Sequence, residues 1–105
     1  MKNKKSFVYK LYCDGIDEVY IGSSKNTLCK RYGDHKYNCN NKGCPKYNQS
    51  KYKFIRENGG FDKWKMEVLE EYINIDEIDL LLEEKKHIEN YEKVLNERLP
   101  IKFYT

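Results

Sequence analysis

Apolar and aromatic residues dominate two short runs near the start of the chain. The run from Phe7 to Tyr12 is rich in aromatic and β-branched residues, and the run from Glu18 to Ser23 has the same character. Asp14-Gly15 between them is a strong turn signal. The pattern therefore predicts two strands that pair as an antiparallel hairpin.

A helix is predicted directly after the hairpin. It runs from about Thr27 to about Tyr37, and Ser24 or Asn26 can cap it through a side-chain oxygen. Leu28 and Tyr32 are four residues apart, so both pack on the same inward face.

A second helix follows a polar loop from Asn38 to Lys42. Pro45 fits its first turn, where the missing N–H does no harm. The helix ends at Asn58-Gly59-Gly60, a left-handed stop signal. Its apolar residues are Tyr47, Tyr52, Phe54 and Ile55.

The last third of the chain predicts a strand and then a long helix. Residues 64–72 alternate, which is typical of a third strand of the same sheet. The helix starts at Asn74 or Asp76 and ends near Glu92, and Pro100 would block any continuation. The strand would place Trp64, Met66, Val68 and Glu70 on one face.

The element order is ββααβα, which indicates an α+β fold: a small three-stranded antiparallel sheet with flanking helices. The chain has 105 residues and no internal repeat. A length in this range predicts a single domain over residues 1–105.

Charge divides unevenly along the chain. Residues 1–65 hold 15 Lys and Arg against 6 Asp and Glu, and residues 66–105 hold 5 against 11. The basic part suits a nucleic acid backbone, with an uneven solvated surface as the alternative. No apolar run reaches the ~20 residues of a membrane span. We expect an intracellular protein, cytoplasmic or nuclear, with no membrane partner. Abundant Lys, Asn, Ile and Tyr suggest an AT-rich coding genome, such as a viral or phage genome.

Four cysteines raise the question of zinc. Cys13, Cys29, Cys39 and Cys44 form no C-x-x-C pair. His35, Cys39 and Cys44, with Cys29 upstream, could close around zinc in a small interaction protein, but the spacings fit no common template. We therefore do not expect zinc, and free buried thiols are the favoured state.

Glu84 stands out as a carboxylate within an apolar helical stripe. Leu81 lies three residues before it, Ile88 four after and Tyr91 seven after, and these offsets share one helix face. Neighbouring Glu83 falls nearer the solvent. An ionised carboxylate on a buried face is costly unless it is paired or binds a metal. Glu84 is therefore a candidate metal ligand, with an ion pair at the rim of the stripe as the alternative.

Two further pairs of side chains suit phosphate chemistry. Arg31 and His35 are four residues apart and share a helix face. Arginine binds phosphate bidentately, and histidine can move a proton near neutral pH. Tyr9 and Tyr20 lie on the hairpin strands, where a phenol could be aimed at a scissile phosphate or at an attacking water. The structural alternatives are a surface pair on a basic helix and buried rings with one hydrogen bond each.

Together these motifs resemble the GIY-YIG nuclease family. Tyr20-Ile21-Gly22 matches the second half of its signature, and Phe7-Val8-Tyr9 replaces Gly-Ile-Tyr but keeps the tyrosine. A second histidine that some members carry after the Arg-x3-His pair has no counterpart here. The resemblance covers residues 6–100 and implies the catalytic domain alone. The other matching positions are Arg31, His35, Glu84 and Asn96.

The resemblance implies a role for each matched residue. Tyr9 or Tyr20 would orient or deprotonate the attacking water. Arg31 would neutralise the charge that builds on the phosphate, and His35 would assist proton transfer or hold the phosphate. Glu84 would bind one divalent ion, Mg²⁺ or Mn²⁺.

The resemblance thus implies a metal-dependent endonuclease that hydrolyses DNA phosphodiester bonds, with Asn96 supporting the site. Binding would depend on backbone charge, so intrinsic sequence specificity would be low. Homo-oligomerisation is one route to specificity that the sequence leaves open. A nucleic-acid-binding module of the same fold without cleavage is the alternative function. The candidate phosphate contacts are Lys25, Lys30, Lys36, Lys46 and Lys51.

Overall fold

The computed structural model describes residues 4–96. Three strands, β1 (Lys5–Tyr12), β2 (Tyr20–Ser24) and β3 (Lys65–Ile73), form one antiparallel sheet in the order β2-β1-β3. The predicted hairpin and the third strand are both confirmed. Because β1 is central, β2 and β3 are the two edges of the sheet.

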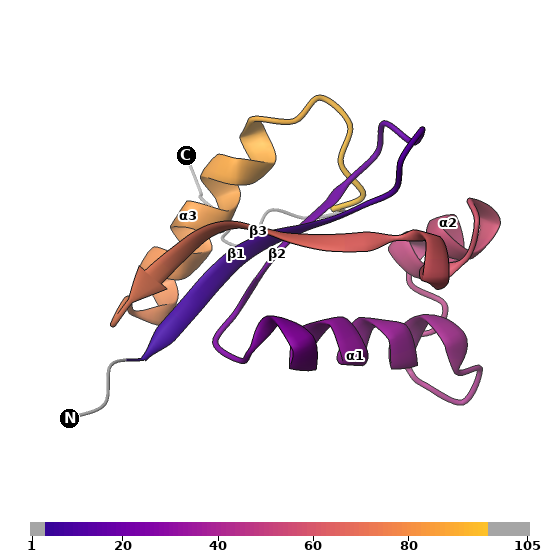
Figure 1. The fold of residues 1–105 in the computed structure, drawn as a ribbon, viewed down its shortest axis with the longest axis horizontal. Coiled ribbons are helices and arrows are strands. Elements are labelled where there is room, and N and C mark those ends of the chain that lie inside the picture. Colours follow the sequence, from indigo (N-terminus) through magenta and orange to yellow (C-terminus); the bar gives the residue numbers. More distant parts are fainter. Residues whose placement is uncertain (1–3, 97–105) are drawn as a thin grey trace, which may run out of the picture.

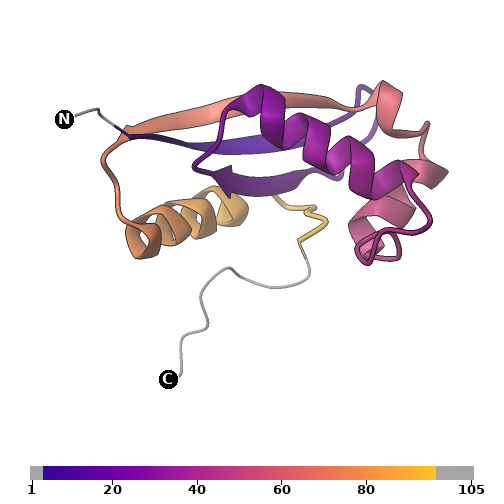
Figure 2. The same ribbon diagram turned by 90° about the horizontal axis from the view of Figure 1, so that it is seen from below.

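The helices lie on both faces of this sheet (Figures 1 and 2). They are α1 (Leu28–Asn40), α2 (Ser50–Glu57) and α3 (Glu77–Glu89), with a short 3₁₀-helix, η1 (Phe61–Lys63), before β3. Helix α3 covers one face, and α1 and α2 lie on the other. The predicted α+β fold with the order ββααβα is therefore confirmed. Within residues 4–96, none of the helices combines the length and apolar character that crossing a membrane requires.

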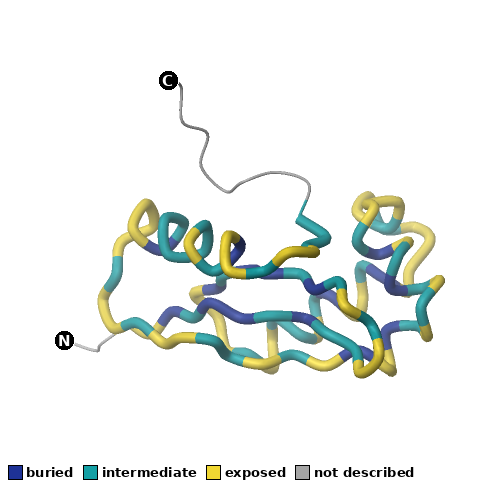
Figure 3. Tube along the Cα trace, turned by 90° about the horizontal axis from the view of Figure 1, so that it is seen from above, coloured by how far each residue is buried: buried dark blue, intermediate teal, exposed yellow. Residues whose placement is uncertain are grey.

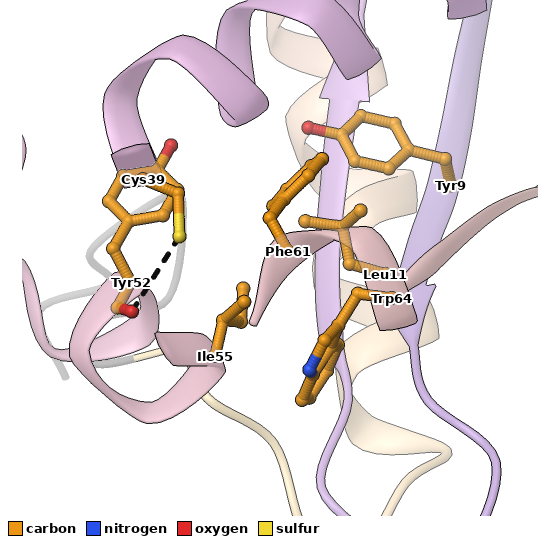
Figure 4. Packing of buried hydrophobic residues seen from close by; sticks show 7 residues of the cluster. All are labelled: Tyr9, Leu11, Cys39, Tyr52, Ile55, Phe61 and Trp64. Carbon is orange, nitrogen blue, oxygen red and sulfur yellow. Dashed lines mark hydrogen bonds between the residues drawn. The ribbon is translucent and has the colours of Figure 1, made fainter. Parts of the chain in front are cut away.

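Side-chain alternation along the strands divides the core into two clusters. Val8 faces α3 and packs with Ile21, Leu80 and Ile88. The next residue of β1, Tyr9, points to the opposite face, and the cluster there joins residues of β1, α1, α2 and η1 (Figure 4). Figure 3 shows the buried positions on the strands and on the inward turns of the helices. The residues of this second cluster are Tyr9, Leu11, Cys39, Tyr52, Ile55, Phe61 and Trp64.

The capping residue and the end of α1 differ from the prediction. Its cap is Thr27, whose hydroxyl accepts a hydrogen bond from the backbone N–H of Lys30 at 3.2 Å. Ser24 is engaged elsewhere, because its hydroxyl accepts from the N–H of Asn26. The helix continues through the expected loop as far as Asn40, because Cys39 is fully buried and holds the last turn against the core.

Helix α2 begins at Ser50, not at Pro45 as predicted. Pro45 instead occupies the second position of a turn closed by the N–H of Tyr47 and the carbonyl of Cys44, a position that suits proline. The Arg56 guanidinium binds the carbonyls of Cys39 and Tyr47 and fixes this stretch against α1.

Helix α3 begins after its cap Asp76, one of the two predicted starts, and ends at Glu89, three residues earlier than predicted. It stops there because the chain turns at Asn90 and Tyr91. The residues after this turn then pair with Val19, directly before β2. Pro100 lies outside the described residues.

Candidate active site

The outer edge of β2 is covered by the end of the described chain. The N–H of Val19 donates to the carbonyl of Lys93 at 3.2 Å, and the N–H of Leu95 donates to the carbonyl of Val19 at 2.8 Å. Asn96 continues this pairing with its side chain. Its Oδ1 accepts from the N–H of Ile21 at 3.0 Å and its Nδ2 donates to the carbonyl of Ile21 at 2.7 Å. The Asn96 amide thus replaces one residue of a neighbouring strand.

Glu84 reaches the same edge from α3. It is half-buried and lies one turn from each of the two buried residues of the helix, Leu80 and Ile88. Its carboxylate accepts hydrogen bonds from the side chain and the backbone N–H of Ser23. Outward-pointing backbone groups recur every second residue of an edge strand. Glu84 therefore satisfies the outward N–H that follows the one bound by Asn96.

Opposing effects act on the pKa of Glu84. Burial raises the pKa of this carboxyl above its ordinary value of 4.5, whereas the Ser23 hydrogen bonds and the charges of Arg31 and Lys51 act in the opposite direction. The result is a half-buried carboxylate whose desolvation cost is partly offset by two hydrogen bonds and two neighbouring positive charges.

A hydrogen-bonded group of four side chains lies on the other face of the sheet. Arg31 Nε donates to Tyr9 Oη at 3.1 Å, and Tyr9 Oη lies 2.7 Å from His35 Nε2. His35 is fully buried, and its Nδ1 lies 2.8 Å from Tyr52 Oη. Burial lowers the pKa of His35 to about 3, with the charges of Arg31 and two lysines adding to the effect. Burial raises the pKa of Tyr9 to about 12, with Arg31 opposing it.

Gly22 makes room for this group. It pairs with Tyr9 across the hairpin, and a Cβ at this position would lie 2.4 Å from Tyr9 Oη and 2.6 Å from Tyr9 Cζ. Such a contact is far inside van der Waals distance. The glycine of the Tyr20-Ile21-Gly22 motif is therefore required by the phenol of Tyr9 and not by an unusual backbone angle.

Tyr20 and Lys51 lie beside a cavity of about 380 Å³. Lys51 Nζ lies 4.3 Å from the centre of the Tyr20 ring and 5.0 Å from that of Tyr52, within the range of a cation–π contact. Burial raises the pKa of Tyr20, and the neighbouring Tyr9 and Glu84 add to the rise. The cavity is lined by Tyr20, Gln49, Ser50, Lys51, Glu84, Leu95 and Asn96.

The structure therefore brings groups from both faces of the sheet to one edge. Tyr20 and Lys51 come from the α1 side and Glu84 from the α3 side, with β2 between them. This is geometrically feasible because β2 is an edge strand, so side chains can meet around it. The positive charge of Arg31, which lies behind the cavity, also acts on the Glu84 carboxylate.

Five lysines were predicted as phosphate contacts, and the structure separates them. Lys51 alone of the five lines the cavity. Lys25 and Lys46 are exposed, although the charge of Lys46 acts on His35. Lys30 and Lys36 are exposed and lie near carboxylates, at 3.5 Å from Asp34 and 4.0 Å from Asp62 respectively.

The alternative zinc arrangement is incompatible with the geometry of its histidine. Both ring nitrogens of His35 are hydrogen-bonded to tyrosine hydroxyls. In residues 4–96 no three His, Cys, Asp or Glu side chains gather as metal ligands. All four cysteines are free thiols, and Cys39 is the one that is fully buried, whereas Cys29 is exposed.

Sequence reasoning missed Ser23 and Tyr52 as site residues. Tyr52 was assigned only to the apolar face of a helix, and its ring does pack in the core (Figure 4). Nothing in the local pattern indicates that its hydroxyl meets a histidine 17 residues away. The contact of Ser23 with Glu84 likewise depends on how α3 packs.

Comparison with protein families agrees with this geometry. The model of the GIY-YIG catalytic domain matches residues 5–98. The chain belongs to the GIY-YIG family. No curated protein and no solved structure showed a match. Membership of this family supports a nuclease-type function, and the family's signature residues fall on the strands and helices that surround the β2 edge.

Proposed function

We propose that this GIY-YIG protein is a divalent-metal-dependent endonuclease that hydrolyses DNA phosphodiester bonds with low intrinsic sequence specificity. The observation that carries the proposal is the meeting of Glu84, Tyr20, Lys51 and Asn96 around one cavity. Arg31 and Tyr9 are hydrogen-bonded to each other behind it. A carboxylate, phenols and fixed cations are the groups that phosphodiester hydrolysis requires.

Glu84 fits a magnesium ion. Mg²⁺ is usually held by one or two carboxylates, with waters and substrate phosphates completing its shell. Among residues 4–96, Glu84 is the carboxylate that lines the cavity. A bound ion would polarise the scissile phosphate and help the leaving oxygen depart.

The other side chains have separate roles in the reaction. Arg31 stays charged and neutralises the negative charge that develops on the phosphate. Tyr20, at the cavity wall, orients the attacking water. Tyr9 first releases its own proton to solvent, and its anion, which accepts N–H hydrogen bonds from Arg31 and, in one tautomer, from His35, then takes the proton of the attacking water. Both ring nitrogens of His35 are occupied by tyrosine hydroxyls, so His35 acts through Tyr9 and does not contact the phosphate.

Low sequence specificity follows from the kind of contact available. Lys51 and Arg31 bear charges suited to phosphate oxygens, and contacts to the backbone fix position without reading bases. Binding is therefore expected to weaken steeply with salt.

A plasmid-nicking assay with Mg²⁺ or Mn²⁺ tests the proposal. Glu84→Gln keeps an oxygen that can accept from Ser23 but removes the charge, so nicking should fall by about 100-fold or more, while DNA binding and Tm are retained. Glu83→Gln is the matched control, because Glu83 is the adjacent residue of α3 and pairs with Lys86 outside the cavity. DNA binding without nicking in either metal would favour the non-catalytic module instead.

A further inference from the structure

The hydrogen-bonded group around His35 contains one member with no assigned role. Tyr52 comes from α2, is 1% exposed, and places its hydroxyl 2.8 Å from His35 Nδ1. Tyr9 occupies the other ring nitrogen, Nε2, at 2.7 Å. The imidazole thus lies between two phenols.

The two phenols cannot act on His35 in the same way. The low pKa of His35, about 3 because of burial, keeps the ring neutral at physiological pH. A neutral imidazole has one N–H donor and one acceptor nitrogen. One tyrosine must therefore donate to the ring while the other accepts from it.

The remaining hydrogen bonds decide which phenol donates. Arg31 donates to Tyr9 Oη, and Asn38 Nδ2 donates to Tyr52 Oη at 3.4 Å. The Asn38 amide is itself oriented, because its Oδ1 accepts from the Cys44 thiol at 3.0 Å. Each phenol already accepts one bond, so the phenol that accepts from His35 as well must send its own proton elsewhere.

If Tyr52 were that phenol, its proton would have no acceptor among the hydrogen bonds of residues 4–96. The ring of Tyr52 packs in the apolar cluster that includes Ile55 and Phe61, and its hydroxyl points toward α1 (Figure 4). A buried donor without a partner is strongly disfavoured. If Tyr9 is that phenol, its proton is also buried, but it lies beside half-buried Arg31 and within electrostatic reach of the Glu84 carboxylate, which can accept it through a bridging water.

We infer that Tyr52 is a positioning residue for the hydrolytic reaction: its hydroxyl donates to His35 Nδ1, fixes the tautomer with the proton on Nε2, and thereby gives Tyr9 Oη a second N–H donor. This inference rests on the proposed nuclease function. With two N–H donors, the ionised form of Tyr9 is stabilised for accepting a proton from water. Tyr52 itself touches neither substrate nor metal.

The tautomer can be measured without any activity. Long-range ¹H–¹⁵N correlation spectra of the labelled wild-type protein report which ring nitrogen carries the proton, and His87→Gln assigns the signals because the chain has 2 histidines. We expect His35 protonated on Nε2. Protonation on Nδ1 would overturn the inference, whether or not the protein cuts DNA.

Kinetics give the second test. Tyr52→Phe keeps the ring in the core and should lower kcat by about 10- to 100-fold, the usual loss when the outer partner of a functional histidine is removed. KM for DNA should be unchanged, and the rising limb of the pH–rate profile should move to higher pH. The matched control is Tyr32→Phe. Tyr32 lies on α1 one turn before His35, and its hydroxyl donates to the Trp64 carbonyl at 3.4 Å.

The outcomes separate the two proposals. An inactive wild type with His35 protonated on Nε2 contradicts the nuclease function but not the hydrogen-bond assignment. If the wild type is active and the variants Tyr52→Phe and Tyr32→Phe have the same kcat and the same pH profile, the proposed role of Tyr52 is contradicted. If Tyr52→Phe does not fold, as shown by its Tm, the wild-type spectrum decides.

Discussion

The hydroxyl of Tyr9 occupies the space that a side chain at Gly22 would need. The two residues face each other across the hairpin, and a Cβ at position 22 would come within 2.4 Å of the phenol oxygen. The same oxygen binds Arg31 and His35. The glycine and the tyrosine of the family signature are thus two parts of one packing arrangement.

Gly22→Ala should therefore damage both stability and activity. The tyrosine is fully buried and cannot move away without breaking its bonds to Arg31 and His35. We expect a loss of about 1–3 kcal/mol in the free energy of unfolding, typical of overpacking, measured by urea denaturation. Nicking by the folded fraction should also fall.

Gly33→Ala is the matched control for this change. Gly33 lies in α1, and a Cβ added there would meet nothing within 4 Å. Alanine at this position should raise stability by about 0.5–1 kcal/mol because it favours the helix. If the two substitutions changed the free energy of unfolding equally, the Tyr9 phenol would not be the reason that position 22 requires glycine.

His35 should make the protein sensitive to acid. Its pKa is lowered from 6.5 to about 3 by burial, so folding favours the neutral ring. The stability that this contributes is complete above the unfolded value of 6.5 and is lost as the pH falls toward 3. Between pH 6.5 and pH 4 the loss is on the order of 3 kcal/mol. It can be measured as the decrease in the free energy of unfolding.

Two histidine variants identify the group responsible for this sensitivity. His35→Gln should flatten the pH dependence of unfolding over this range. His87→Gln is the comparison variant, because His87 is partly exposed and pairs with Glu70 on the outside of the sheet. A profile that is flattened by His87→Gln and kept by His35→Gln would contradict the prediction.

Lys51 should contribute more to DNA binding than Lys53, the other lysine of its helix. It lines the cavity with its ammonium over the Tyr20 ring. Lys51→Met keeps the apolar stem and removes the charge. DNA affinity should fall about equally for all sequences, and the slope of log K against log salt should shrink by about 1.

Lys53→Met provides the reference for that measurement. Lys53 is exposed on α2, two residues further along. Fluorescence anisotropy with one duplex at several salt concentrations compares the two variants. Indistinguishable slopes would remove Lys51 from the set of phosphate contacts.

The strands and the last helix could be predicted because their signals are local. The aromatic and β-branched composition of residues 7–12, the alternation in residues 64–72 and the turn at Asp14-Gly15 predicted the sheet to within a few residues. Glu84 was singled out by the apolar residues around it, and it does lie in line with Leu80 and Ile88. The errors at α1 and α2 have a tertiary origin: the burial of Cys39 and the two carbonyl contacts of Arg56.

The sequence by itself determined the kind and order of the elements and which side chains bring charge and phenols, because periodicity and residue chemistry are properties of the chain. Only the tertiary structure decided that Glu84 and Tyr20, which come from opposite faces of the sheet, meet around the edge strand β2. It also decided that the hydroxyl of Tyr52 meets His35. These contacts join residues far apart in the chain, and their geometry is set by helix packing, which no local pattern encodes.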